Sequence, residues 1–171
     1  MKREAEIDFP KRKRTRLINF DYSRNGAYFI TICTQDRKNI LSSIVGEGLA
    51  PPAIRLTPYG EIAEEQLLLL KKRYSHIMIE KYVIMPNHIH VLLRLNDDTG
   101  GASPSPTVSD IVCTFKSLTS CKCRRKYGIQ RMFQRSFYDH IIRNAEDYIN
   151  IRNYIELNPV YWKKDCFYNQ D

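Results

Sequence analysis

Two histidines two residues apart, inside a run of strand formers, constrain this chain more than any other feature. The stretch Met85–Leu93 reads Met-Pro-Asn-His-Ile-His-Val-Leu-Leu. Strand side chains alternate between faces, so His88 and His90 are predicted to share one face while Ile89 and Val91 bury the other. Two adjacent imidazoles form half of a site for a divalent metal ion. The alternative that the spacing leaves open is a pair of solvent-facing histidines with no ligand.

The chain is strongly basic, which favours a polyanionic partner. Over 171 residues it carries a formal net charge of +8. Nucleic acid is the commonest such partner, although a basic protein can be merely soluble. Residues 1–20 form a basic N-terminal arm, which is predicted to be either solvated or in contact with phosphates. The arm residues proposed as DNA contacts are Lys11, Arg12, Lys13 and Arg14.

Length and composition predict one domain over residues 1–171, with residues 163–171 as a C-terminal tail. No apolar run approaches the ~20 residues that span a bilayer, so we expect no membrane partner. The charged N-terminus predicts no secretory signal. The five cysteines are an odd number without framework spacing, which predicts free thiols and a cytoplasmic location.

Residue patterns predict an α+β fold. β-Branched and aromatic runs predict strands at about residues 27–34, 77–85, 88–95 and 137–143. Capping residues and helical spacing predict helices over about residues 57–74, 107–127 and 144–157, the second one capped by Thr107 or Ser109. Residues 41–56 are predicted to be a loop or a small hairpin. The element order favours a ferredoxin-like, antiparallel four-stranded sheet with helices on one face, plus a C-terminal helix.

The predicted helix over residues 107–127 has a basic end. Its Lys and Arg residues form either a solvated face or a face that grips phosphates. The further candidate DNA contacts are Lys116, Lys122, Arg124 and Arg125 on this helix, and Arg143 after the fourth strand.

A tyrosine and an asparagine one turn apart lie on the last predicted helix. Tyr154 and Asn158 stand at i and i+4 and therefore share one face. Next to His88 and His90 they would supply a nucleophile and a third metal ligand. Plain packing, with Asn158 as a helix C-cap, is the alternative. Trp162, in the tail that follows, is predicted to pack in the core.

Three blocks together resemble the HUH single-tyrosine transposases, and within them the REP-associated tyrosine transposases. The blocks are residues 85–90 (Met-Pro-Asn-His-Ile-His), 137–144 (Phe-Tyr-Asp-His-Ile-Ile-Arg-Asn) and 154–160 (Tyr-Ile-Glu-Leu-Asn-Pro-Val). The resemblance implies that His88 and His90 are metal ligands and that Tyr154 is the nucleophile. Asn158 stands where the family places its third ligand, at a position where insertion-sequence members usually have glutamine.

The resemblance also implies a reaction. Tyr154 would cleave single-stranded DNA beside a palindromic hairpin, form a 5′-phosphotyrosine and allow rejoining, with Mg²⁺ or Mn²⁺ as cofactor. A nearby cation such as Arg143 or Lys122 would favour the phenolate. The family further implies a bacterial, nucleoid-associated protein. A monomer is favoured over a homodimer that exchanges the tyrosine helix.

Three other functions fit part of the pattern. A catalytically silent DNA regulator would bind palindromes without cutting them. A metal-dependent hydrolase would use water as nucleophile and leave Tyr154 without a role. An RNA-binding module would share the fold, which by itself does not decide function, but the aromatic pair expected on adjacent central strands is not obvious. His140 is interpreted as structural, paired with Asp139 or the sheet edge.

Overall fold

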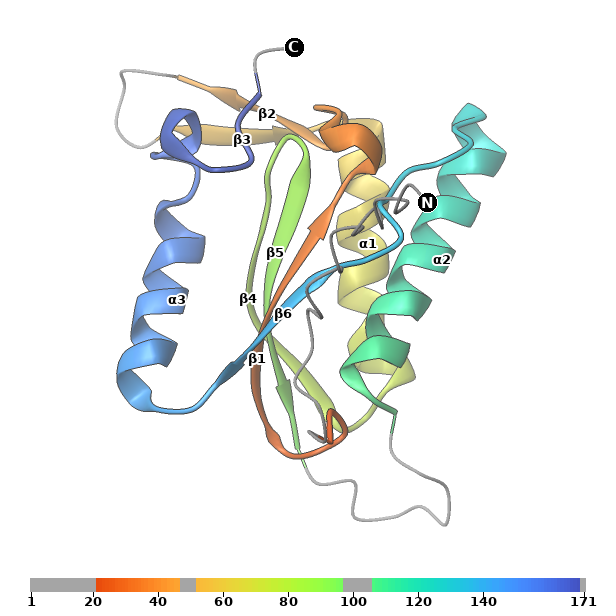
Figure 1. Cartoon of the computed structure of the whole chain (residues 1–171). Helices are drawn as coiled ribbons and strands as arrows, with labels where there is room; N and C mark the ends of the chain where they lie inside the picture. Colours follow the sequence, from red (N-terminus) through yellow and green to blue (C-terminus); the bar gives the residue numbers. More distant parts are fainter. Residues whose placement is uncertain (1–20, 47–51, 97–105, 170–171) are drawn as a thin grey trace, which may run out of the picture.

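The computed structural model describes residues 21–46, 52–96 and 106–169. Within these ranges the chain forms six strands and three α-helices (Figure 1). In chain order they are β1 (Gly26–Cys33), β2 (Ser42–Val45), β3 (Ala53–Leu56), α1 (Pro58–Arg73), β4 (Ile77–Ile84), β5 (His88–Leu95), α2 (Val108–Tyr127), β6 (Tyr138–Ile142) and α3 (Ala145–Leu157).

Four strands form one antiparallel sheet in the order β4-β5-β1-β6. β5 lies between β4 and β1, and its register places His88 opposite Cys33 and His90 opposite Thr31. This is the predicted ferredoxin-like arrangement, so the fold class is confirmed. The segment left open as a loop or hairpin is a hairpin, β2–β3, tied to the end of β4 by the Ser42 hydroxyl, which donates to the Ile84 carbonyl at 2.8 Å.

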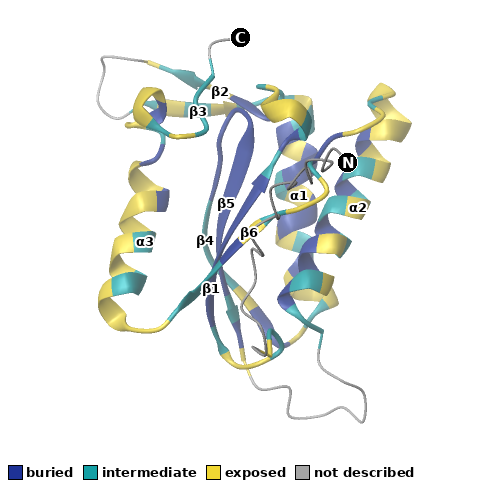
Figure 2. Cartoon of the chain, in the orientation of Figure 1, coloured by how far each residue is buried: buried dark blue, intermediate teal, exposed yellow. Residues whose placement is uncertain are grey.

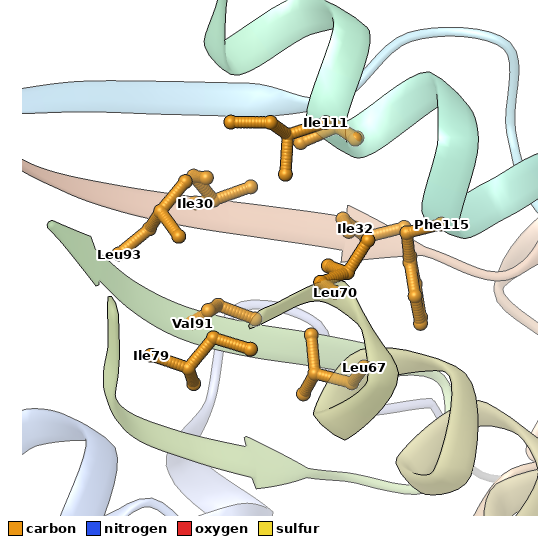
Figure 3. A pocket seen from close by; sticks show the side chains of 10 residues that line it. Ile30, Ile32, Leu67, Leu70, Ile79, Val91, Leu93, Ile111 and Phe115 are labelled. Atoms are coloured by element: carbon orange, nitrogen blue, oxygen red, sulfur yellow. The ribbon is translucent and has the colours of Figure 1, made fainter. Parts of the chain in front are cut away.

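α1 and α2 cover one face of the sheet (Figure 1). Figure 3 shows Ile30 and Val91 from the sheet beside Leu67 of α1 and Phe115 of α2. The apolar side chains here enclose a cavity of only about 10 Å³. A void of that size is at the limit for a single water molecule, which would also need polar partners. This layer is therefore the main core rather than a ligand site.

Each α-helix begins at a polar side chain that caps its first turn. The Thr57 hydroxyl accepts from the backbone N–H of Gly60, and the Asn144 side chain accepts from that of Asp147. For α2, Thr107 and Asp110 form a reciprocal capping box, which decides between the two predicted caps in favour of Thr107. None of the described helices combines the length and apolar character needed to cross a membrane.

α3 covers the opposite face of the sheet (Figure 1). Ile155 of α3 is buried with Phe29 and Leu92 of the sheet and Met85 of the β4–β5 turn, and Trp162 joins them from the turn after α3. Trp162 therefore packs in the core, as the sequence predicts. The fold thus has helices α1 and α2 on one face and the tyrosine-bearing helix on the other.

His140 links the edge strand β6 to α3. Its Nε2 lies 2.8 Å from a carboxylate oxygen of Asp147. Of the two predicted alternatives, Asp139 or the sheet edge, the structure agrees with the second, since His140 lies on an edge strand and the carboxylate that its Nε2 contacts is that of Asp147.

Candidate metal and tyrosine site

His88 and His90 lie side by side on the face of the sheet that α3 covers. Their exposed fractions are 0% and 1%, and their ring centroids are 4.4 Å apart. Ile89, between them, points into the core under α1 and α2. Their burial excludes the alternative of two solvent-facing strand histidines.

Each imidazole is held through Nδ1. Asn87 donates from Nδ2 to the carbonyl of Phe167 at 2.8 Å, which leaves its Oδ1 2.9 Å from Nδ1 of His88. An amide oxygen can only accept, so His88 carries its hydrogen on Nδ1 and a lone pair on Nε2. The Thr31 hydroxyl lies 2.9 Å from Nδ1 of His90. Metal-binding histidines are typically oriented in this way, through the nitrogen that does not bind the ion.

Burial keeps both imidazoles neutral. Loss of hydration lowers the pKa of His88 from 6.5 to about 4, although the Asp165 carboxylate acts in the opposite direction. Burial also lowers the pKa of His90, and the neighbouring His88 adds to that effect. The neutral imidazole is the form that binds metal ions.

Tyr154 and Asn158 extend from α3 toward the histidines. The Tyr154 ring centroid lies 5.2 Å from that of His90, and the Asn158 amide contacts His88. Asn158 occupies the C-cap position of α3, as the packing alternative states, but its side chain is 3% exposed and turned into the site. The structure thus brings the four residues of the two sequence blocks into one cluster.

The Tyr154 phenol lies at the rim of this cluster. It is 41% exposed, and its hydroxyl donates to Oδ2 of Asp165 at 3.2 Å. Partial burial and the negative charge of Asp165 raise the pKa of Tyr154 above its ordinary value of 10. The hydroxyl is therefore protonated at neutral pH, and a nucleophilic role requires that its proton be removed during reaction.

Asp165 joins the site from the tail, which turns back over the cluster after α3 (Figure 1). Besides Tyr154, it accepts from Nδ2 of Asn158 at 2.6 Å. A carboxylate oxygen of Asp165 and ring nitrogens of His88 and His90 all lie within 4.8 Å of one another. The sequence analysis missed this residue. It follows a short 3-10 turn (Trp162–Lys164), so no strand or helix periodicity indicates its direction.

Three buried side-chain atoms in the cluster have no hydrogen-bond partner among the described residues: Nε2 of His88, Nε2 of His90 and Oδ1 of Asn158. An unpartnered buried polar atom costs roughly 1–3 kcal/mol. A cation bound between them would remove that cost. Two imidazole nitrogens with an amide oxygen and a carboxylate suit Mn²⁺ or another first-row divalent ion better than Mg²⁺, which prefers oxygen ligands. These residues therefore fit a divalent metal ion.

Four of the nine proposed DNA contacts lie outside the described residues, namely Lys11, Arg12, Lys13 and Arg14. Three others are engaged within the fold. Lys116 donates to the carbonyls of residues 134–136, and Lys122 pairs with Glu65 of α1 at 2.6 Å. Arg124 donates to the carbonyl of Gln130 at 3.1 Å. Arg125 and Arg143 are exposed, and neither forms an ion pair with another described residue.

Neither cation suggested as an activator of the tyrosine lies at the site. Arg143 precedes α3 and Tyr154 lies in its last turn, a separation of about 16 Å along the helix. Lys122 belongs to α2, on the opposite face of the sheet (Figure 1). That prediction is wrong. The cation that lies near the histidines is Arg37, with its guanidinium carbon 5.1 Å from the ring centroid of Phe167, and its charge adds to the burial that lowers the pKa of His88.

Comparison with known proteins identifies a family for this chain. Residues 22–158 match the family model described as "Transposase IS200 like". The matched range contains both histidines, Tyr154 and Asn158, and it ends before Asp165.

Individual relatives agree with that match. An uncharacterized protein of Haemophilus influenzae is 27% identical over 172 residues, which cover 92% of this chain and 93% of the relative. A REP-associated tyrosine transposase of Escherichia coli K12 is 25% identical over 139 residues, which cover 81% of this chain and 69% of the relative. The solved structure of a REP-associated tyrosine transposase bound to a REP hairpin has the same fold, with a TM-score of 0.61 and 21% identity over 86% of this chain and 74% of that one.

Proposed function

The chain belongs to the IS200-like transposase family, and from that premise we propose that it breaks and rejoins single-stranded DNA beside a hairpin, through a covalent bond to Tyr154. The relative named REP-associated tyrosine transposase, and the REP hairpin bound by the solved relative, support a palindromic repeat as the substrate. The net charge of +8 supports a polyanionic partner.

One observation carries the proposal. Three buried ligand atoms, to which no residue in the described part of the chain hydrogen-bonds, lie beside a partly exposed phenol. Structural histidines normally have both nitrogens satisfied or in contact with solvent. A phenol at the rim, with the ligand atoms behind it, places the nucleophile where a phosphodiester can approach from solvent and next to the residues that would hold the ion.

His88, His90 and Asn158 would hold the divalent ion, Mg²⁺ or Mn²⁺, with Asp165 beside them. When bound, such an ion polarises a phosphodiester oxygen and offsets the charge that develops on it. The neutral state of both histidines leaves them ready to serve as ligands at physiological pH.

The chemistry at Tyr154 follows from its hydroxyl contact. The hydrogen on Oη points at Oδ2 of Asp165, which is therefore the acceptor for the phenol proton as the tyrosine oxygen bonds to phosphorus. The bond from phosphorus to the 3′ oxygen breaks, and that oxygen takes a proton from water, which recovers a proton from Asp165, so that the carboxylate is restored and no net proton is released. The products are a 5′-phosphotyrosine and a free 3′-hydroxyl. Because the covalent link retains the energy of the broken bond, attack by a 3′-hydroxyl reverses the step without ATP.

The test uses a hairpin with unpaired flanks, taken from DNA beside the gene of this protein and labelled at its 3′ end. Wild type, Tyr154→Phe and His88→Ala are incubated with Mn²⁺ or with EDTA and run on a denaturing gel. Tyr138→Phe, which alters an exposed tyrosine on β6, is the matched control. We expect a labelled protein–DNA band with Mn²⁺ in wild type and Tyr138→Phe, and no band in the other lanes.

Other results would favour the remaining functions. Cleavage that persists in Tyr154→Phe would identify a hydrolase that uses water. Tight binding by wild type with no covalent band, on several hairpins, would identify a regulator that binds palindromes without cutting them.

A further inference from the structure

One side of α3 carries an uncharged stripe that runs from the exposed Asn150 and Asn153 to the buried Asn158 at the tyrosine site. Asn150, Asn153, Tyr154, Leu157 and Asn158 recur at helical spacing, so they share one face. With the tail they line a groove of about 490 Å³. Figure 2 shows that most of α3 is exposed, and Ile155 is its one buried residue among those described.

The composition of this stripe is unusual for a solvated helix face, which normally carries charged residues. Leu157 and Tyr161 are 44% and 53% exposed. The side chains of Asn150 and Asn153 are exposed and make no hydrogen bond to the part of the chain that the structure describes. Carboxamides hydrogen-bond to base edges, and an exposed aromatic ring stacks on an unpaired base.

The positively charged side chain of Lys164 also lines the groove. Nζ of Lys164 lies 5.9 Å from the centroid of the Tyr161 ring, so a phosphate and a stacked base would find their partners side by side. The groove volume lies within the range of sites that bind small molecules or single nucleotides. Tyr154 belongs to the groove wall. A DNA strand joined to its oxygen therefore has to leave through, or next to, this groove.

We propose that the groove binds the unpaired nucleotides on the two sides of the phosphate that Tyr154 attacks. One base stacks on Tyr161 with its phosphate near Lys164. The other faces the carboxamides of Asn150 and Asn153, which lie within about 6 Å of Tyr154 along the helix axis. This subsite rests on the proposed function, because it takes Tyr154 as the point of attack. It would make the protein selective for the sequence at the cleavage point, separately from the hairpin.

The test measures binding without cleavage, in a Tyr154→Phe background with Mn²⁺. The probe is the fluorescent hairpin from beside the gene, with each unpaired position replaced in turn by an abasic sugar. We expect Tyr161→Ala to weaken binding about 5- to 100-fold. At one unpaired position, the abasic sugar should weaken the binding of the parent protein. In Tyr161→Ala, the abasic sugar at that position should cause no further loss of affinity. Tyr138→Ala removes a ring of similar exposure (52%) on another surface and should leave affinity unchanged.

Asn153→Ala should reduce the preference for one base at a second unpaired position, while total affinity falls less than tenfold. The subsite would be overturned if, at every position, the loss of binding free energy from the abasic sugar simply added to the loss from Tyr161→Ala. It would also be overturned if sedimentation showed a dimer that Tyr161→Ala dissociates, since the groove would then be a contact between copies of the chain.

The two proposals fail separately. Suppose that the abasic-sugar effect at one position is lost in Tyr161→Ala, but wild type forms no covalent adduct. The cleavage proposal then fails and the subsite stands. If the adduct forms but no position is coupled to Tyr161, the subsite falls and the cleavage proposal stands.

Discussion

The side-chain nitrogen of Asn158 donates to Oδ2 of Asp165 at 2.6 Å, and this contact decides which end of the amide faces the histidines. With Nδ2 engaged, Oδ1 is directed to the buried side, where it has no partner. Asp165 is itself fixed, because its Oδ1 accepts from the backbone N–H of Phe167 at 2.7 Å. The amide therefore presents its oxygen as a ligand before any cation binds.

Replacing Asp165 by asparagine should weaken Mn²⁺ binding about 10- to 100-fold, the usual effect of losing a residue that orients a ligand. The change removes a nearby negative charge and leaves one acceptor oxygen in place of the two that bind Phe167 and Asn158, so the amide of Asn158 is held less firmly. Free Mn²⁺ is measured by electron paramagnetic resonance as protein is added, without DNA. Glu146→Gln removes an exposed carboxylate at the far end of α3 and should leave the Kd unchanged. Equal Mn²⁺ affinities for wild type and Asp165→Asn would exclude this role.

The variant Asn87→Ala should affect both metal binding and stability. It removes the acceptor for the Nδ1 hydrogen of His88 and the donor to the Phe167 carbonyl. We expect a 10- to 100-fold weaker Kd for Mn²⁺ and a loss of about 1–3 kcal/mol in the unfolding free energy of the metal-free protein. Calorimetric titration and urea unfolding measure the two quantities. Asn96→Ala, at the other end of β5, is the control. Equal values of the Kd for Mn²⁺ and of the unfolding free energy in the two variants would contradict the prediction.

Most of the fold could be predicted because its determinants are local. The two-residue period separates His88 from Ile89, and capping side chains mark where each helix starts. For α2 the sequence predicts Thr107 or Ser109 as the cap, because both residue types cap helices. The choice depends on the Asp110 carboxylate, which reaches back to the N–H of Thr107 at 2.9 Å.

The candidate site could be predicted only in halves. Spacing places His88 with His90 and Tyr154 with Asn158, but it says nothing about whether the two pairs meet. The family resemblance supplied that link, and the packing of α3 on the sheet brings them together. Asp165 could not be found in this way, since it reaches the site through a tail that lacks a repeating pattern. The predicted DNA contacts on α2 show what spacing leaves out: the sequence does not indicate that Lys122 pairs with Glu65 of α1, and its contact with DNA stays a prediction.

Acid should destabilise the metal-free protein over a defined pH window. The pKa of His88 is about 4 in the folded chain and near 6.5 in the unfolded chain. Between these values the unfolded chain binds a proton that the folded chain excludes. The contribution to stability is therefore complete above pH 6.5 and decreases as the pH falls toward 4, by about 1.4 kcal/mol per pH unit. The lowered pKa of His90 acts in the same direction.

Thermal melts in EDTA between pH 7 and pH 4.5 measure this effect. The Tm of wild type should fall steeply across that range, and the Tm of His88→Gln should fall less. Parallel pH profiles would mean that His88 does not titrate in this window.

Gly60→Ala should destabilise the fold, although alanine is the better helix former by about 1 kcal/mol. A Cβ at this position would lie 2.0 Å from the backbone oxygen of Leu41, which cannot swing aside as a side chain would. That oxygen also accepts from the backbone N–H of Thr57 at 2.9 Å, so it joins the first turn of α1 to the segment before β2. We expect a loss of about 1–3 kcal/mol in the free energy of unfolding by urea. Glu61→Ala, an exposed change in the same turn, should stay close to wild type. Wild-type stability for Gly60→Ala would mean that α1 moves away from Leu41 at no cost, and that this contact does not hold the helix in place.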